Sequence, residues 1–130
     1  MHKPRPEFSA AFFQTDNCDA LPSTFGIVTA YNPNGELTSE EHNRAADSEI
    51  ASYLETVGLP HFRVTGGAKD GSHLEAGFAI PAADPEVIRK IALRFQQEAF
   101  FWVVDGFIFL SNVNGSELYP IGQWRERQMK

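Results

Sequence analysis

Alternating and continuous hydrophobic runs along the chain predict five β-strands. The run Phe25–Tyr31 is almost free of charge and rich in β-branched and aromatic residues, which is typical of a central strand buried on both faces. Asn32-Pro33 closes this run, because proline has no N–H to donate to a sheet and restricts the residue before it. Two apolar runs flank Asp105-Gly106, a clear hairpin signal. We expect the strands over residues 24–31, 61–65, 73–80, 99–104 and 107–110.

Two helices are expected between these strands, over residues 39–57 and 85–98. Thr38 and Glu41 have the spacing of a capping box at the start of the first helix. The apolar positions of this helix recur at helical spacing, and they are Ala46, Ile50, Tyr53, Leu54 and Val57. Asp84 followed by proline supplies an N-cap residue and a proline at the first helical position, which marks the start of the second helix.

The second and third strands are separated by a Gly-rich loop, which predicts a hairpin. Antiparallel pairing across this loop places Arg63 opposite Glu75 and Thr65 opposite His73, and the opposite charges of the first pair support that register. The loop lacks the Gly-Lys-Ser/Thr ending of a phosphate-binding loop. We therefore interpret it as a flexible connection.

The order of the elements predicts an α+β fold. Strand, helix, strand, strand, helix, strand is the order of the ferredoxin-like, split βαββαβ arrangement, and the last predicted strand would extend its sheet at one edge. Right-handed crossovers would place both helices on one face of an antiparallel sheet. The spatial order of the strands would be fifth, fourth, first, third, second.

This topology brings polar residues that are distant in the sequence to one rim of the sheet. The first strand ends, the first helix begins, the third strand begins and the second helix ends at that rim. Polar groups that converge beside an apolar sheet are typical of a small-ligand or peptide site, although loops and helix ends are polar in any fold. The candidate ligand-binding residues are Tyr31, Asn32, Asn43, Arg44, His73, Glu75 and Gln97.

The chain is expected to form a single α+β domain over residues 25–124. Residues 1–24 would form an arm that packs on this domain, and residues 125–130 a frayed tail. Both faces of the 99–110 hairpin are apolar, so one of them needs a cover from the N-terminal phenylalanines, the tail with Trp124, or another chain. If another chain supplies the cover, the hairpin is a surface for a protein partner or for self-association. Its candidate residues are Phe100, Trp102, Phe107 and Phe109.

Composition and charge argue against several classes of partner. The formal net charge is −6, which disfavours binding to nucleic-acid phosphates and to anionic membrane surfaces. The single cysteine, Cys18, cannot form an internal disulfide, so a reducing, cytoplasmic location is expected. The first residues carry no hydrophobic stretch typical of a signal peptide, and no apolar run has the length of a membrane span.

Candidate chemistry in the chain is sparse. His73 and Glu75 lie on one strand face and could act as an acid–base pair, since histidine titrates near neutrality. With His61 on the neighbouring strand they could also contribute to a metal site, but Arg63 lies among them, and we expect no metal and no cofactor. No serine elbow, cysteine–histidine pair or nucleotide fingerprint is present. We therefore favour a protein-interaction or regulatory module that could bind a small ligand at the sheet rim, with a small enzyme using His73 and Glu75 as the alternative.

Four short motifs in order resemble one known family. They are Thr29-Ala30-Tyr31-Asn32-Pro33, Asn43-Arg44, His73-x-Glu75-x-Gly77-Phe78, and Phe95-x-Gln97-x-Ala99 leading to Trp102. Together they resemble the bacterial domain-of-unknown-function family 3293, over about Phe25 to Leu110. That family tends to have proline after the glutamate of the third motif, where this chain has Ala76. The family has no established activity, so the resemblance supports the domain boundaries and implies no mechanism.

Overall fold

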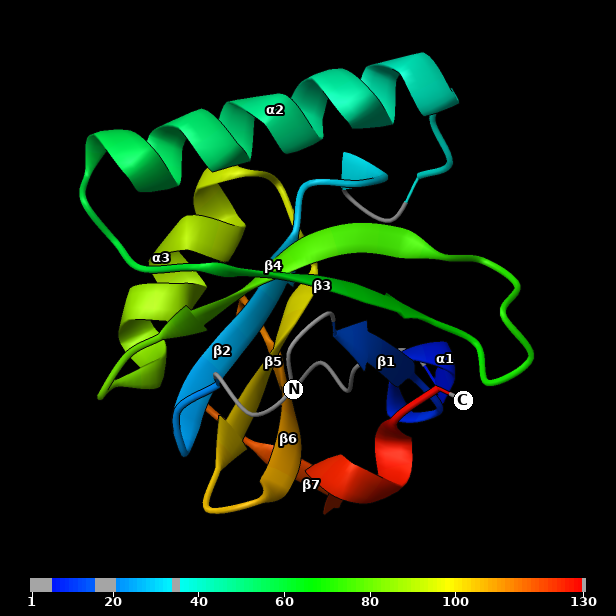
Figure 1. Ribbon diagram of the computed structural model, residues 1–130, viewed down its shortest axis with the longest axis vertical. Coiled ribbons are helices and arrows are strands. Elements are labelled where there is room, and N and C mark those ends of the chain that lie inside the picture. Colours follow the sequence, from blue (N-terminus) through cyan, green and yellow to red (C-terminus); the bar gives the residue numbers. More distant parts are fainter. Residues whose placement is uncertain (1–5, 16–20, 34–35, 130) are drawn as a thin grey trace.

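The computed structural model describes residues 6–15, 21–33 and 36–129 (Figure 1). Cys18 lies outside these residues. The elements are α1 (Pro6–Ser9), β1 (Phe12–Thr15), β2 (Thr24–Thr29), α2 (Glu40–Thr56), β3 (Phe62–Gly67), β4 (Glu75–Pro81), α3 (Pro85–Arg94), β5 (Ala99–Val104), β6 (Phe107–Asn112), β7 (Tyr119–Gln123) and the 3₁₀ helix η3 (Trp124–Arg127). The five predicted strands and two predicted helices are all present.

The sheet corrects the predicted fold class. It is antiparallel, has seven strands in the order β1-β3-β4-β2-β5-β6-β7, and curls into a half-barrel. The five expected strands lie in the expected relative order. The ferredoxin-like prediction is nevertheless wrong, because the N-terminal arm and the C-terminal segment add a strand at each edge. β1 has four residues and pairs with the distant β3, whereas β7 pairs with its neighbour β6 but contains a proline and a glycine, so neither strand has a clear strand pattern in the sequence.

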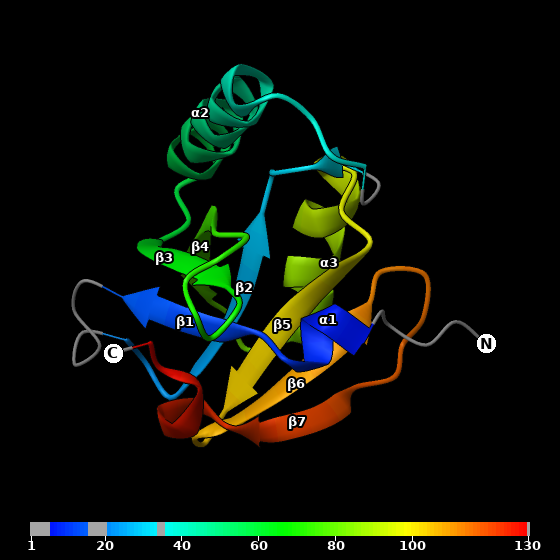
Figure 2. The ribbon, with the colours of Figure 1, turned by 90° about the vertical axis from the view of Figure 1, so that its right-hand side faces the viewer.

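The two edges of the sheet are joined by the C-terminal segment (Figure 2). The Arg127 guanidinium donates hydrogen bonds to the carbonyls of Ser9 and Ala11, which precede β1, and to the carbonyl of Ile121 in β7. Beyond it, the N–H of Met129 donates to the carbonyl of Phe13 at 2.8 Å. The expectation of a frayed tail is therefore wrong for residues 125–129, which hold the half-barrel together.

One face of the sheet carries both long helices. Ile50 and Leu54 of α2 and Ile88 of α3 are fully buried in a single cluster with Phe78, Phe100 and other side chains of that face. Gly26 of β2 allows the close approach of α3, since a Cβ at this position would lie 2.2 Å from Ile88 Cγ1. α3 therefore packs directly on the central strand.

The opposite face has its own aromatic core. The Phe13 ring packs edge-on against Phe101, with ring centroids 4.9 Å apart, and lies 5.2 Å from the Trp124 ring. Trp124 also packs edge-on against Phe25 at 5.3 Å. The N-terminal arm and the C-terminal segment thus both supply the cover that the hairpin requires.

The β5–β6 hairpin is confirmed, and its burial limits what it can bind. Asp105 and Gly106 both have positive φ, at 50° and 83°, as a two-residue hairpin turn requires. Of the four side chains proposed as an interaction surface, Phe100 and Trp102 are buried in the core and Phe109 is half-buried. Phe107 is 53% exposed.

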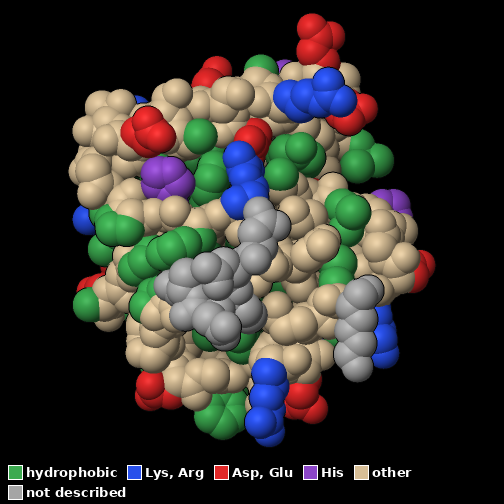
Figure 3. Space-filling model, viewed as in Figure 1, with side chains coloured by type: hydrophobic (Ala, Val, Ile, Leu, Met, Phe, Trp, Pro, Cys, Tyr) green, Lys and Arg blue, Asp and Glu red, His purple; other side chains and the backbone are tan. Residues whose placement is uncertain are grey.

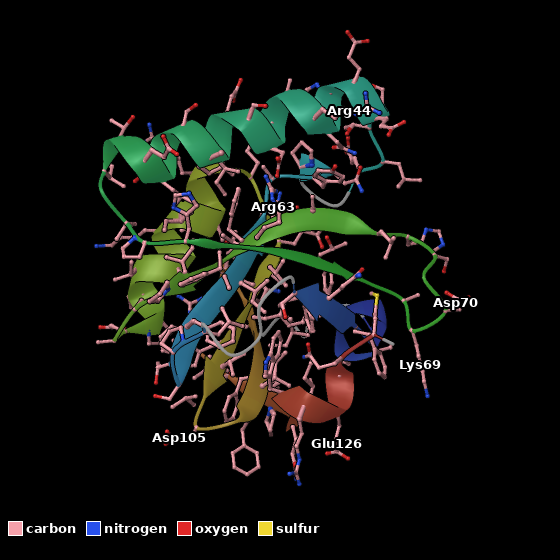
Figure 4. The ribbon with its side chains drawn as sticks, in the orientation of Figure 1. Arg44, Arg63, Lys69, Asp70, Asp105 and Glu126 are labelled. Atoms are coloured by element: carbon pink, nitrogen blue, oxygen red, sulfur yellow. The ribbon has the colours of Figure 1, made fainter. Side chains whose placement is uncertain are left out.

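The register of β3 and β4 differs from the prediction. Arg63 lies opposite Phe78, Thr65 opposite Ala76, and Glu75 opposite Gly66. Arg63 points toward α2 (Figure 4), where it forms two hydrogen bonds with the carboxylate of Asp47, at 2.7 and 3.1 Å. A tertiary ion pair, rather than a cross-strand pair with Glu75, therefore satisfies this arginine.

The ends of the helices also differ in detail. Ser39, rather than Thr38, caps α2, and its hydroxyl accepts a hydrogen bond from the N–H of His42. Asp84 caps α3 as predicted. α3 ends at Arg94 rather than near Glu98, because Gln96 adopts a φ of 59° that a continuing helix cannot contain.

Candidate functional site

A network of hydrogen bonds joins the end of β2 to the start of α2. The N–H of Asn32 donates to Asn43 Oδ1 at 2.9 Å, and Asn43 Nδ2 donates to Asn32 Oδ1 at 3.1 Å. Thr38 adds a hydroxyl bond to Asn43 Oδ1 at 2.6 Å and an N–H bond to Asn32 Oδ1 at 3.1 Å. Asn43 is buried, so these bonds satisfy polar groups that water does not reach.

Glu75 extends this network to the start of β4. Asn32 Nδ2 donates to Glu75 Oε2 at 3.3 Å. Burial raises the pKa of the Glu75 carboxyl, and the bond from Asn32 opposes that shift. The ionised form of Glu75 is therefore unfavourable, because its described partner here is an uncharged amide and not a cation.

Gln97 attaches the α3–β5 turn to the same segment. Its Nε2 donates to the carbonyl of Tyr31 at 3.1 Å and to the carbonyl of Phe95 at 3.2 Å. The segment Tyr31–Asn32 is therefore held on one side by α2 and on the other by the turn after α3. Five of the seven predicted residues meet here: Tyr31, Asn32, Asn43, Glu75 and Gln97.

The other two predicted residues do not join this network in the described part of the chain. Arg44 is exposed on α2 (Figure 4) and pairs with Glu40, one turn earlier, at 2.7 Å. His73 is exposed, precedes β4 and has a φ of 52°. It forms no described hydrogen bond with Glu75, so the geometry gives no support to an acid–base pair. Direct ligand binding by the seven residues stays a prediction.

A groove lies beside the network, between α2 and the α3–β5 turn. Its volume is about 460 Å³, within the range of small-molecule sites. In Figure 3, charged side chains of both signs cover the α2 end of the molecule, and hydrophobic side chains reach the surface just below α2. The groove is lined by His42, Ala46, Glu49 and Tyr53 of α2, by Arg94, Phe95 and Gln96, and by Ala30 and Pro33.

Aromatic side chains form one end of the groove. The Tyr53 ring packs edge-on against Phe95, with centroids 5.8 Å apart, and the Arg94 guanidinium lies 4.5 Å from the centre of the Tyr53 ring. A guanidinium stacked on a ring keeps its N–H groups directed outward in its own plane. This end of the groove therefore combines an apolar surface with a cation.

Sequence reasoning missed most of the groove. His42, Ala46, Glu49 and Tyr53 follow one another at spacings of four, three and four residues, so they form one stripe along α2. The sequence contains that spacing, but Ala46 and Tyr53 also belong to the apolar face of the predicted helix, which indicates core positions. The position of Arg94 in the groove could not be predicted, because α3 ends at Arg94, four residues earlier than expected.

The described residues contain no group of three or more His, Cys, Asp or Glu side chains that could hold a metal ion. The site that they do form has amide, carboxylate, guanidinium and aromatic groups. Such groups can bind and orient a small organic molecule.

Comparison with known families identifies the chain. Residues 28–100, more than half of the chain, match the family described as "Protein of unknown function (DUF3293)". The chain therefore belongs to this family, which confirms the resemblance drawn from the four motifs. All residues that line the groove fall within the matched range. Neither a curated protein nor a solved structure matches the chain significantly.

Among the described residues, no helix combines the length and the apolar character that a membrane span requires.

Proposed function

We propose that this domain is a regulatory module that binds a small organic molecule in the groove between α2 and the α3–β5 turn. The observation that supports this function is that both walls of the groove are fixed to one short segment. Asn43 ties the α2 wall to Asn32, and Gln97 ties the opposite wall to Tyr31. The family motifs thus maintain the shape of the groove.

This role differs from the direct ligand contacts expected from the sequence. The amides of Asn32 and Asn43 are occupied by each other, by Thr38 and by Glu75. A ligand would have to displace these bonds to use them. In our proposal they position the residues that line the groove, and the lining residues contact the ligand.

α2 is the element through which binding would act. It has seventeen residues, of which Asn43, Ile50 and Leu54 are buried, while Ala46, Ala51 and Tyr53 pack against the core and stay partly exposed. A helix with few buried side chains opens more easily than a core strand, so a ligand that bridges it to the α3–β5 turn would tighten it. In this proposal, ligand binding regulates by making α2 more ordered.

Binding can be tested without knowing the natural ligand. A panel of small aromatic and aliphatic fragments, neutral, anionic and cationic, is titrated into ¹⁵N-labelled protein. We expect at least one fragment to shift the backbone resonances of Ala46, Tyr53 and Gln96. Amide hydrogen exchange in α2 should slow in the presence of that fragment.

Two tryptophan variants of adjacent residues distinguish the groove from other surfaces. Ala46→Trp fills the groove and should abolish the shifts, whereas Ala45→Trp places the same side chain on the exposed face of α2 and should leave them unchanged. Both variants are first compared with the parent chain by urea unfolding. Shifts that persist in folded Ala46→Trp, or a panel without any binder, would overturn the proposed function.

A further inference from the structure

Arg94 is set apart from the other described arginines by its lack of a polar partner. The others bond to side chains or carbonyls: Arg44 to Glu40, Arg63 to Asp47, Arg89 to Glu86, Arg125 to Gln123, and Arg127 to three carbonyls. For Arg94, the contact found in the described part of the chain is the Tyr53 ring. The net charge of the chain is −6, yet this exposed arginine pairs with no carboxylate among the residues that the structure describes.

The stacking of Arg94 prepares it to bind a planar anion. The ring fixes the guanidinium, so less conformational freedom is lost when its N–H groups form hydrogen bonds. A carboxylate accepts two parallel bonds from this fork. The aromatic end of the groove, with Tyr53 and Phe95, provides an apolar surface for the body of the same ligand.

Another lining residue, Glu49, limits the charge that the ligand can carry. Glu49 lies one helical turn before Tyr53 on the same stripe of α2, so a second negative charge on the ligand would be repelled. Gln96 has a φ of 59°, the left-handed conformation that ends α3, and this turn places Gln96 in the groove wall.

We propose that the groove binds an aromatic monocarboxylate, with the carboxylate on the Arg94 guanidinium and the ring against Tyr53 and Phe95. This inference rests on the proposed function and specifies its ligand class. The shared chemistry covers a free aromatic acid and an aromatic amino acid, which differ in an ammonium group that Glu49 could bind.

The test compares 3-phenylpropanoate with its neutral amide, 3-phenylpropanamide, by NMR titration of the full chain. The parent protein should bind the acid about 10–100-fold more tightly than the amide, as expected for charge-assisted hydrogen bonds. Arg94→Gln should bind the two compounds equally, and Arg125→Gln should retain the preference. Phenylalanine is titrated in parallel into the parent chain and into Glu49→Gln. A loss of phenylalanine affinity in that variant, with the acid unaffected, assigns the ammonium to Glu49.

The outcomes separate this inference from the proposed function. If the acid and amide bind the parent chain equally, or if Arg94→Gln retains the preference, the assignment to Arg94 is overturned while the groove remains a binding site. If neither compound binds but other fragments of the panel shift the groove resonances, the ligand class is overturned and the proposed function stands. If no fragment binds at all, both fail.

Discussion

The backbone and side chain of Asn32 form reciprocal hydrogen bonds with the side-chain amide of Asn43. Asn32 donates its N–H to Asn43 Oδ1 at 2.9 Å and accepts from Asn43 Nδ2 at 3.1 Å. Asn32 has a φ of 48°, a conformation that asparagine tolerates better than most residues. The pair therefore fixes both the direction in which the chain leaves β2 and the position of the first turn of α2.

Removing one partner tests this pair. Asn43→Ala leaves the N–H of Asn32 without its acceptor and removes the nearer of the two acceptors of the Thr38 hydroxyl, so we expect a loss of about 1–3 kcal/mol in the free energy of unfolding. Urea denaturation measures it. The neighbouring Arg44→Ala, which removes an exposed ion pair, should change stability by less than about 1 kcal/mol. Equal effects of the two substitutions would contradict the role given to Asn43.

Local chemistry explains which parts of the fold could be predicted. Asp105-Gly106 and Asp84-Pro85 specify a turn and a helix start from neighbouring residues, and both predictions are confirmed. The β3–β4 register depends on the contacts of Arg63 with Asp47 and Phe78, which are distant in sequence. Local alternation carries no information about such contacts. The same reason applies to β1, whose burial depends on Phe101 and Trp124.

The candidate site was predictable to the extent that it depends on strand order. That order brings Asn32, Asn43, Glu75 and Gln97 to one rim. The groove depends instead on how α2 lies over the end of α3, and side-chain packing decides that. The sequence therefore allows prediction of the residues that hold the site together, but not of the residues that line the groove.

Glu75 should make stability depend on pH in the opposite direction from an ordinary paired carboxylate. Its pKa is raised above the usual 4.5, so its contribution to stability is fully present below 4.5 and is lost as the pH rises through the folded-state pKa. Glu75→Gln keeps an acceptor for Asn32 and removes the half-buried charge. We expect this variant to be more stable than the parent chain at neutral pH, with the difference disappearing in acid, as measured by urea denaturation across pH.

Asp70 provides the control of opposite sign. Hydrogen bonds from the Ser72 hydroxyl and N–H lower its pKa, so its contribution is present above the usual 3.8 and is lost as the pH falls through the folded-state pKa. It is exposed on the β3–β4 loop (Figure 4), so its effect should be small. If Glu75→Gln is no more stable than the parent chain at neutral pH, the assignment of an unfavourable charge to Glu75 is wrong.

Arg127 should control the order of the N-terminal edge strand. Arg127→Ala removes the bonds to the carbonyls of Ser9, Ala11 and Ile121, and we expect a loss of about 1–3 kcal/mol. Hydrogen exchange in β1 should accelerate more than in β2. Arg127→Lys keeps the charge without the planar fork and should recover only part of the loss. Unchanged exchange in β1 would show that the pairing with β3 and the packing of Phe13 hold this strand without Arg127.

Two aromatic residues of the hairpin should respond differently to truncation. Trp102 is 4% exposed, so Trp102→Ala should lower the free energy of unfolding by about 3–5 kcal/mol. Phe107 is 53% exposed, and Phe107→Ala should cost less than about 1 kcal/mol. Thermal unfolding compares them. A large loss in Phe107→Ala that depends on protein concentration would indicate that a second copy covers this side chain.

Gln96 tests whether strain in the groove wall is retained for binding. Gln96 follows the last turn of α3 at the position that usually holds glycine, and its neighbour Gln97 donates its N–H to the carbonyl of Ala92 at 2.9 Å. Gln96→Gly relieves the positive φ at some entropic cost, so we expect a net gain of about 0.5–1 kcal/mol in unfolding free energy. Gln97→Gly, one residue along, removes the bonds to Tyr31 and Phe95 and should instead destabilise the protein.

If the Gln96 amide contacts the ligand, Gln96→Gly will bind 3-phenylpropanoate more weakly although it is more stable. A variant that gains stability and keeps full affinity would show that the strain serves no purpose in binding.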